Sequence, residues 1–297
     1  MTSMRQRFYE LAAQALDDDP RVAMVFAEIG VTEMPAAHPR FFNVGIREQL
    51  MIGVAAGLAL EGMRPVVHTY APFLVERPYE MLKLDLGHND LGAVLVSIGG
   101  SFDASASGRT HQAPEDVAIV AALPGWTIEV PGHADEVETA FRRALASEGR
   151  VYIRLELGSN TEAHDGTRLN VLRRGSGTAP LVVAVGPTLD ETLAATADLD
   201  VTLAYLATVR PFDRAGLRAA LPGTDVVLVE PTLAGTSAAE VARALVDRPH
   251  RLFALGVENA ELRRYGTREE HRAAHGLDAA GIRAAIDAFA ARKLRAA

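Results

Sequence analysis

The sequence predicts an α/β protein with two three-layer α/β/α domains, and three observations support this. Short runs rich in Val, Ile and Leu alternate with longer segments of helical periodicity, which is typical of parallel βαβ units. These runs lack regular polar alternation, as in AVLVSI, and this favours sheets covered by helices on both faces. A polar, glycine-rich stretch interrupts the pattern between residues 158 and 180. We therefore divide the chain into residues 1–165 and 166–297.

The first domain is expected to begin with a helix. MTSMRQRFYELAAQALDDDP has a helical apolar pattern and lacks the basic start and cleavage site of a signal peptide. Strands are expected at residues 22–26, 65–69, 92–98 and 151–155. Helices are expected to start near Ile46, Pro72, Pro114 and Ala134.

The second domain repeats the alternation after the polar stretch. Its strands are expected at residues 181–185, 201–206, 225–230 and 251–257. Helices are expected near Leu189 and Ala215 and from Ser237. A final amphipathic helix over residues 278–292 closes the chain.

Composition excludes several classes of function. The 297 residues are 48% hydrophobic and carry a formal net charge of −8, with Lys and Arg spread singly or in pairs, so nucleic acid is not an expected partner. The chain has no cysteine, which excludes disulfides and thiolate metal sites and favours a cytoplasmic protein. Its longest uncharged apolar run, residues 49–60, is shorter than the roughly 20 residues of a membrane span. We expect no membrane segment.

The stretch FFNVGIREQLMIGVAAGLALEG combines an apolar helix with a polar start. Apolar or small residues occupy almost every side of the helix, which predicts burial all round. Gly53 and Gly57 would let another backbone approach closely, so we expect a domain or subunit interface here. One interpretation of the polar start is a cap: with Gly45 as N-cap, Glu48 would bond free backbone N–H groups. Capping alone does not explain why so apolar a helix follows.

Four motifs in this order resemble the transketolase family. FFNVGIREQ is similar to F-x-N/D-V-G-I-A-E-Q, and HTYAPFLVERPYEMLKLD is similar to T-F-x-x-F-x-x-x-R-A-Y-E-Q. GRTHQAPEDVAIVAALPGWTIEVPGHADEV matches the family segment built on T-H-Q and E-D, and GRVYIRL matches the strand P-V-Y-I-R-L. The resemblance covers residues 40–157. It implies a thiamine-diphosphate pyrimidine-binding domain followed by a transketolase C-terminal-like domain.

The resemblance implies a role for Glu48 in binding thiamine diphosphate. In the family this glutamate bonds N1' of the aminopyrimidine in a dry pocket, and the bond favours the imino tautomer that deprotonates the thiazolium ring. A charge-assisted hydrogen bond is stronger at low dielectric than in water. Ile46 lies in the same motif, Tyr70 and Phe73 match positions that stack on the pyrimidine, and Arg77 matches a family position in the pocket. Arg77 and Tyr79 could equally be structural.

The resemblance also implies substrate contacts. His111, in the T-H-Q motif, matches a histidine that reaches polar oxygens of the substrate and can transfer protons. Arg154 matches an arginine that binds the sugar phosphate in some relatives, although a surface ion pair is the alternative. Arg5 is a further candidate phosphate contact. Glu48 and His111 are therefore the expected catalytic residues.

This sequence lacks the domain that holds Mg2+ and the diphosphate in full-length transketolases. The nearest string to its G-D-G motif, His164-Asp165-Gly166, has no preceding strand, and we interpret it as a turn. The resemblance therefore implies the C-terminal subunit of a split transketolase. We expect no metal ligand in this chain. A separate subunit would bind Mg2+ and share thiamine diphosphate with it, giving an α2β2 heterotetramer.

The expected activity is transfer of a two-carbon ketol unit from a sugar-like ketose to an aldose. Two alternatives share this chemistry: a 1-deoxyxylulose-5-phosphate synthase-like reaction and a 2-oxo acid dehydrogenase E1-β-like reaction. A non-catalytic partner subunit is a third. Departures from the family leave the substrate open, since Ser107 replaces an Asp, GGSFDASAS lacks a sugar-binding His, and Glu230-Pro231-Thr232 replaces E-E-H.

Overall fold

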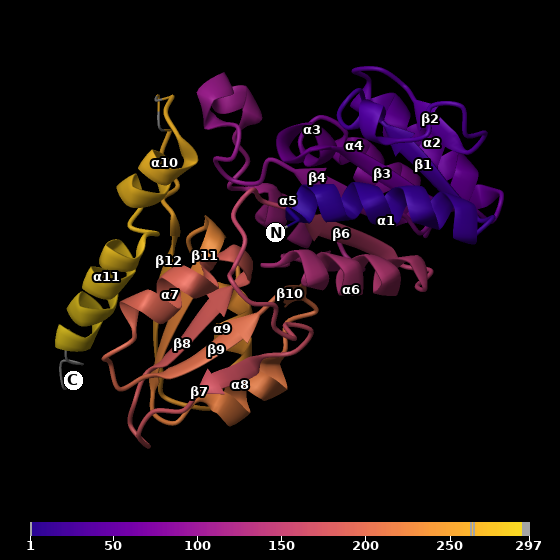
Figure 1. Cartoon of the computed structure of the whole chain (residues 1–297). Helices are drawn as coiled ribbons and strands as arrows, with labels where there is room; N and C mark the ends of the chain where they lie inside the picture. Colours follow the sequence, from indigo (N-terminus) through magenta and orange to yellow (C-terminus); the bar gives the residue numbers. More distant parts are fainter. Residues whose placement is uncertain (1, 262, 264, 293–297) are drawn as a thin grey trace.

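The computed structural model describes residues 2–261, 263 and 265–292 and contains two β-sheets side by side (Figure 1). The N-terminal half builds most of a seven-stranded sheet, and the C-terminal half builds a five-stranded one. Helices cover both faces of each sheet, as expected from strands without polar alternation. The predicted α/β fold class is confirmed.

The larger sheet has the strand order β10-β5-β6-β4-β3-β1-β2. All neighbours are parallel except β10, which pairs antiparallel with β5. β10 follows residue 165 in the sequence, so one strand of the second expected domain completes the sheet of the first. The strands are β1 (Val22–Phe26), β2 (Phe41–Asn43), β3 (Arg64–Tyr70), β4 (Val94–Ile98), β5 (Trp126–Glu129), β6 (Arg150–Arg154) and β10 (Thr208–Arg210).

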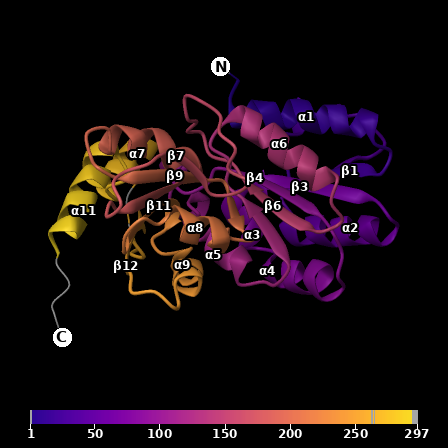
Figure 2. The same ribbon diagram turned by 90° about the horizontal axis from the view of Figure 1, so that it is seen from below.

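Two layers of helices enclose this sheet (Figure 2). One face carries α1 (Met4–Asp18) and α6 (Ala134–Leu145), which pack on each other through Phe8 of α1 and Phe141 of α6. The other face carries α2 (Glu48–Leu60), α3 (Ala71–Val75) and α5 (Asp116–Ala121). It also carries α4 (Tyr79–Met81), which continues as a π-helical segment, Leu82–His88.

The smaller sheet has the order β12-β11-β8-β9-β7, parallel except for β7. α8 (Arg214–Ala220) and α9 (Ala238–Ala244) cover one face, and α7 (Leu189–Ala195) and α11 (Ala279–Ala291) the other. α10 (Arg268–Ala274) precedes α11. The strands are β7 (Asn170–Arg173), β8 (Leu181–Val185), β9 (Thr202–Leu206), β11 (Asp225–Leu233) and β12 (Arg251–Val257).

The apolar runs in the sequence all became strands, whereas α10, the edge strands β2, β7 and β10 and the inner strand β5 were missed. β2, β5, β7 and β10 contain only three or four residues each, too few to show a period. The helix expected from Pro72 is α3, which ends at Val75 before α4 and the π-helical segment follow. In the part of the chain that the structure describes, no helix is both long and apolar enough to cross a bilayer.

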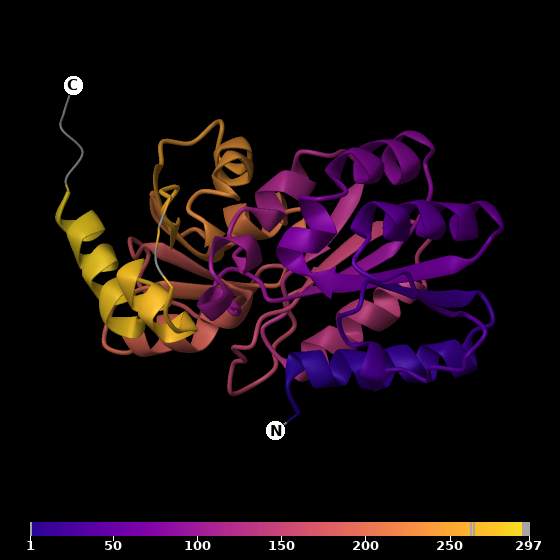
Figure 3. The same cartoon turned by 90° about the horizontal axis from the view of Figure 1, so that it is seen from above.

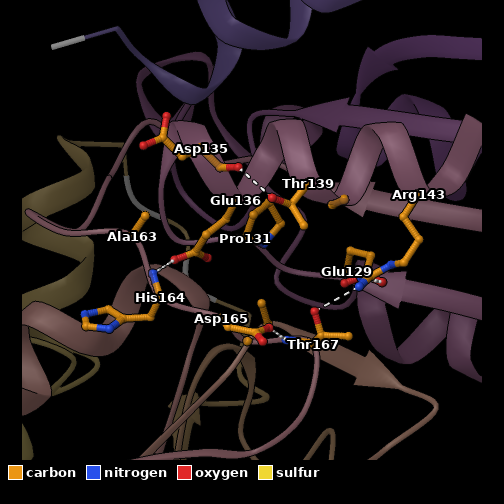
Figure 4. Close-up of a pocket in the computed structure, with 13 residues that line it drawn as sticks. Glu129, Pro131, Asp135, Glu136, Thr139, Arg143, Ala163, His164, Asp165 and Thr167 are labelled. Atoms are coloured by element: carbon orange, nitrogen blue, oxygen red, sulfur yellow. Dashed lines mark hydrogen bonds and ion pairs between the residues drawn. The ribbon is translucent and has the colours of Figure 1, made fainter.

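Glu136 joins the two halves of the chain beside a cavity of about 260 Å³ (Figure 4). Its carboxylate accepts hydrogen bonds from Gly132 N, His164 N and the Tyr205 hydroxyl. Asp165 accepts a bond from Thr167 N, 3.0 Å away, so the string His164-Asp165-Gly166 turns the chain here, as its sequence context predicted. The polar groups that line this cavity bond to each other, and we assign it a structural role.

Glu230 on β11 makes stability depend on pH. It is buried, its Oε1 accepts a hydrogen bond from Ser237 N at 3.1 Å, and burial raises its pKa to about 7. The folded chain therefore binds this proton more tightly than the unfolded chain. The stabilisation that protonated Glu230 contributes is lost as pH rises from about 4.5 through about 7. We expect Glu230→Gln to be stabilised relative to the parent chain by up to about 3 kcal/mol at pH 8, and by much less at pH 5.

Urea unfolding at both pH values measures this difference, with Glu61→Gln, an exposed residue, as the control. A Glu230→Gln effect that is the same at pH 5 and pH 8 would contradict the assignment.

Candidate active site

Glu48 is the first residue of α2, and its carboxylate does not cap the helix. Arg47 is the N-cap and makes no side-chain capping bond, whereas Gly45 lies outside the helix with φ of +70°. The cap interpretation of the polar start is therefore wrong. Glu48 is only 2% exposed, although its helix lies at the surface of this chain. A buried carboxylate needs partners from the protein or from a ligand.

Arg77 provides one partner for Glu48. Its Nη1 lies 2.9 Å from Glu48 Oε1, and its guanidinium lies over the Phe73 ring with Cζ 3.9 Å from the centroid. The backbone carbonyl of Arg77 accepts a bond from Gln49 at 3.2 Å, which ties the end of α3 to the start of α2. Glu48 Oε2 has no hydrogen bond to the described residues. The second oxygen is thus available to a ligand.

Tyr70, Phe73 and His111 form an aromatic group beside this pair. Their ring centroids lie 4.9 Å apart for Phe73 and His111, 5.8 Å for Tyr70 and His111, and 6.0 Å for Tyr70 and Phe73, all edge to face. Gly99 allows this arrangement, since it has φ of +72° and a Cβ there would lie 2.2 Å from the Tyr70 ring. The loop after β4 therefore passes directly against the aromatic group.

The group lies where parallel strands end. Tyr70 is the last residue of β3, Phe73 is in the helix that follows, and His111 is in the loop between β4 and α5. Ligands of open α/β sheets collect at the carboxyl ends of the strands. Residues far apart in the sequence therefore meet at a position suited to binding.

Arg5 and Ile46 lie at the edges of this region. Arg5 and Tyr70 line a cavity of about 60 Å³ together with Asp103 and Glu156. Arg5 Nε donates to the Tyr9 hydroxyl at 3.1 Å, and that hydroxyl contacts Nε2 of the buried His68. Burial lowers the pKa of His68 to about 3 and keeps the ring neutral. Ile46 is 70% exposed in the turn before α2.

Arg154 is separated from this region by its own partners. Its guanidinium has no exposed surface, and Nε lies 3.0 and 2.8 Å from the two Asp116 oxygens. Nη1 bonds Glu156, and Nη2 lies 2.6 Å from Ser101 Oγ. The alternative of a surface ion pair is wrong, because the pair is fully buried. A substrate could reach this guanidinium only if Glu156 or Ser101 moved.

The structure adds charged residues that sequence reasoning missed. Burial, together with the negative charge of the neighbouring Glu156, raises the pKa of Asp103 to about 8. Burial also opposes ionisation of Glu156, but Arg154 and Arg268 outweigh it and leave the pKa of Glu156 lowered. Arg268 pairs with Asp103 and Glu156, which lie more than 100 positions earlier in the sequence, so no local pattern could have connected these residues.

The surroundings of Glu48 fit an aminopyrimidine ring. They provide a secluded carboxylate with an available oxygen, next to aromatic side chains that can stack on a flat ring. Within the described ranges, no three or more His, Asp or Glu side chains are grouped to hold a metal ion.

Comparisons with known proteins identify the family of this chain. The family described as "Transketolase, pyrimidine binding domain" matches residues 1–159. The chain belongs to the transketolase family. That family depends on thiamine diphosphate.

Its relatives include a protein of about the same length as this chain and an enzyme about twice as long. An "Uncharacterized 33.6 kDa protein in fasciation locus" of Rhodococcoides fascians is 48% identical over 97% of this chain and 95% of its own length. A 1-deoxy-D-xylulose-5-phosphate synthase of Thioalkalivibrio sulfidiphilus is 31% identical over 96% of this chain, which spans only 47% of that enzyme. The structure named "Split gene transketolase, inactive beta4 tetramer" has a TM-score of 0.81 and 26% identity, covering 96% of this chain and 97% of that one.

Proposed function

We propose that this transketolase-family chain is the pyrimidine-binding subunit of a thiamine-diphosphate-dependent enzyme that transfers a two-carbon ketol unit from a ketose to an aldose. One observation carries the proposal. Glu48 is buried and paired through Oε1 with Arg77, and its Oε2 remains available. The Arg77 guanidinium lies over the ring of Phe73, which contacts Tyr70 and His111. A purely structural subunit has no need for a buried carboxylate with one oxygen left without a hydrogen-bond donor.

The residues of this chain would divide the work as follows. Thiamine diphosphate, when bound, supplies the nucleophilic carbon for ketol transfer. Glu48 Oε2 would accept a hydrogen bond from protonated N1' of the pyrimidine ring, while Arg77 holds Oε1. Phe73 and Tyr70 provide ring surfaces and exclude water. His111, exposed enough to meet substrate, exchanges a proton with a substrate oxygen.

A second subunit completes the proposed enzyme by binding the diphosphate and Mg2+. One comparison supports this: the fold of the chain matches a chain named as a split gene transketolase. The outer side of α2 provides a surface for the partner, because it exposes Ile46, Leu50 and Leu60. Gly53 and Gly57 lie on the same side with open space around the position of a Cβ. We propose an α2β2 heterotetramer for the assembly.

The synthase-like reaction is the second candidate function. It is favoured by the 31% identity to a 1-deoxy-D-xylulose-5-phosphate synthase. Both reactions use the same pyrimidine pocket, so the substrates distinguish them.

The test is reconstitution. We expect the chain mixed with a diphosphate-binding subunit, thiamine diphosphate and Mg2+ to transfer ketol units from a panel of ketose donors, whereas the chain alone should be inactive. His111→Ala should lower turnover or raise KM by about 10²-fold, the lower range for general acid–base groups, without changing the affinity for thiamine diphosphate.

Steady-state kinetics and calorimetric titration with the cofactor measure the two quantities. His88→Ala, at an exposed position on the same half of the chain, is the matched control. If His111→Ala abolished cofactor binding instead, the residue would belong to the cofactor site. Activity of the chain without any second subunit would refute the split assembly.

A further inference from the structure

We infer that Arg268, on α10 of the C-terminal half, is a positioning residue that holds the loop carrying His111 in place. The loop, residues 101–113, follows β4 and lies beside α10 (Figure 3). The inference rests on the proposed role of His111. Through Arg268, the C-terminal half would contribute to the reaction, although the aromatic group of Tyr70, Phe73 and His111 lies entirely in the N-terminal half.

Arg268 connects two segments of the N-terminal half. Its Nε lies 3.0 Å from Asp103 Oδ1, on the loop, and its Nη2 lies 3.3 Å from Glu156 Oε2, just after β6. The planar, forked guanidinium can reach both carboxylates at once, which the single ammonium of lysine does less well. Gly158 leaves room for it, since a Cβ there would lie 2.0 Å from Arg268 Nη2.

The connection continues from Glu156 to both ends of the loop. Glu156 bonds Arg154, which in turn bonds Ser101 at the start of the loop and Asp116 just beyond its end. Ala113 N donates to Ser101 O at 3.1 Å and closes the base of the loop. The loop residues between these anchors include His111. Loss of Arg268 would leave the Glu156 carboxylate buried with one cation fewer and Asp103 buried without its guanidinium partner, which favours movement of both side chains toward water.

Other contacts make α10 and the loop one packed unit. Phe102 stacks on His271 and His275, with centroids 4.4 and 5.1 Å apart. Ser105 Oγ donates to the carbonyl of Gly266, 2.6 Å away, just before α10. Among the described residues, Arg268 has no hydrogen bond or ion pair to Glu48, Tyr70, Phe73 or His111. It therefore acts through the loop and not on a reacting atom.

Hydrogen exchange on the full chain tests the inference without a partner or substrate. We expect the amides of residues 101–113 to exchange at least about tenfold faster in Arg268→Gln, while β1, β3 and β4 stay protected. Arg268→Lys should restore part of the protection. Arg272→Gln is the matched control, because Arg272 lies one turn later in α10, is similarly buried and bonds Leu277 O. Unchanged loop exchange in Arg268→Gln, or an equal change in Arg272→Gln, would overturn the inference.

A second variant removes the loop side of the same contact. Asp103→Leu has a similar volume and no polar atom to meet Arg268, so it should loosen residues 101–113 in the same way while leaving α10 intact. A folding defect specific to Arg268→Gln would therefore not decide the matter. If the loop keeps its protection in Asp103→Leu, the inference fails.

Kinetics in the assembled enzyme separates positioning from simple packing. Arg268→Gln should lower kcat at least about tenfold with the affinity for thiamine diphosphate unchanged, and Arg268→Lys should recover part of the loss. Faster loop exchange with full kcat would make Arg268 merely structural and overturn the positioning role. Full activity of Glu48→Gln would instead refute the proposed function and leave the exchange result standing.

Discussion

Replacement of Glu48 by Ala is expected to abolish turnover of the assembled enzyme, with a loss of at least about 10²-fold. Glu48 is the buried carboxylate of the candidate pocket, and its Oε2 has no bond within the described residues. Without it, no carboxylate would accept a hydrogen bond from N1'–H of the imino tautomer, and Arg77 loses its partner. The fold should survive because Glu48 lies at the first residue of α2 and makes no capping bond.

Initial rates of the reconstituted complex measure this effect, and circular dichroism with size-exclusion chromatography shows that fold and assembly persist. Glu61→Gln is the matched control because Glu61 is exposed at the other end of α2. Glu48→Gln adds a nearly isosteric variant that keeps the hydrogen-bonding atom but removes the charge. Unchanged activity in Glu48→Ala would exclude the role in cofactor activation.

Arg154→Met is expected to destabilise the chain by about 3–5 kcal/mol, the range for breaking a buried ion pair by removing one partner. The substitution leaves the Asp116 and Glu156 carboxylates buried, with Arg268 as the remaining cation on Glu156 and the Tyr152 hydroxyl and Val117 N as hydrogen-bond donors to Asp116. Methionine fills most of the volume, so the loss reflects charge and not a cavity. Guanidinium unfolding at pH 7 gives the free energy.

Arg142→Met provides the comparison on the surface. Arg142 pairs with Glu138 one helical turn away at 2.8 Å. Arg142 is exposed and Glu138 is half-buried, so the loss of Arg142 should cost less than about 1 kcal/mol. Similar losses in the two variants would show that Arg154 is not an internal anchor. That result would reopen its candidate role as a substrate contact.

The printed residues alone indicated the main strands and helices and the chemistry of the pocket. Runs such as residues 181–185 became strands because a fully buried sheet needs continuous apolar side chains. Glu48, Tyr70, Phe73 and His111 were identified because each lies inside a motif with fixed local spacing. The structure brings these four residues together, although their roles stay predictions.

Other features depend on contacts between distant segments, and the sequence could not reveal them. The motif gave Glu48 its family role, but only the folded chain shows Arg77 on one carboxylate oxygen and leaves the other open. Arg154 was expected near substrate, yet Asp116, Glu156 and Ser101 surround it. Arg268 meets Asp103 from 165 positions away. A local pattern records hydrophobic period and motif spacing, whereas the partner of a buried charge is decided by which segments the packed sheets bring together.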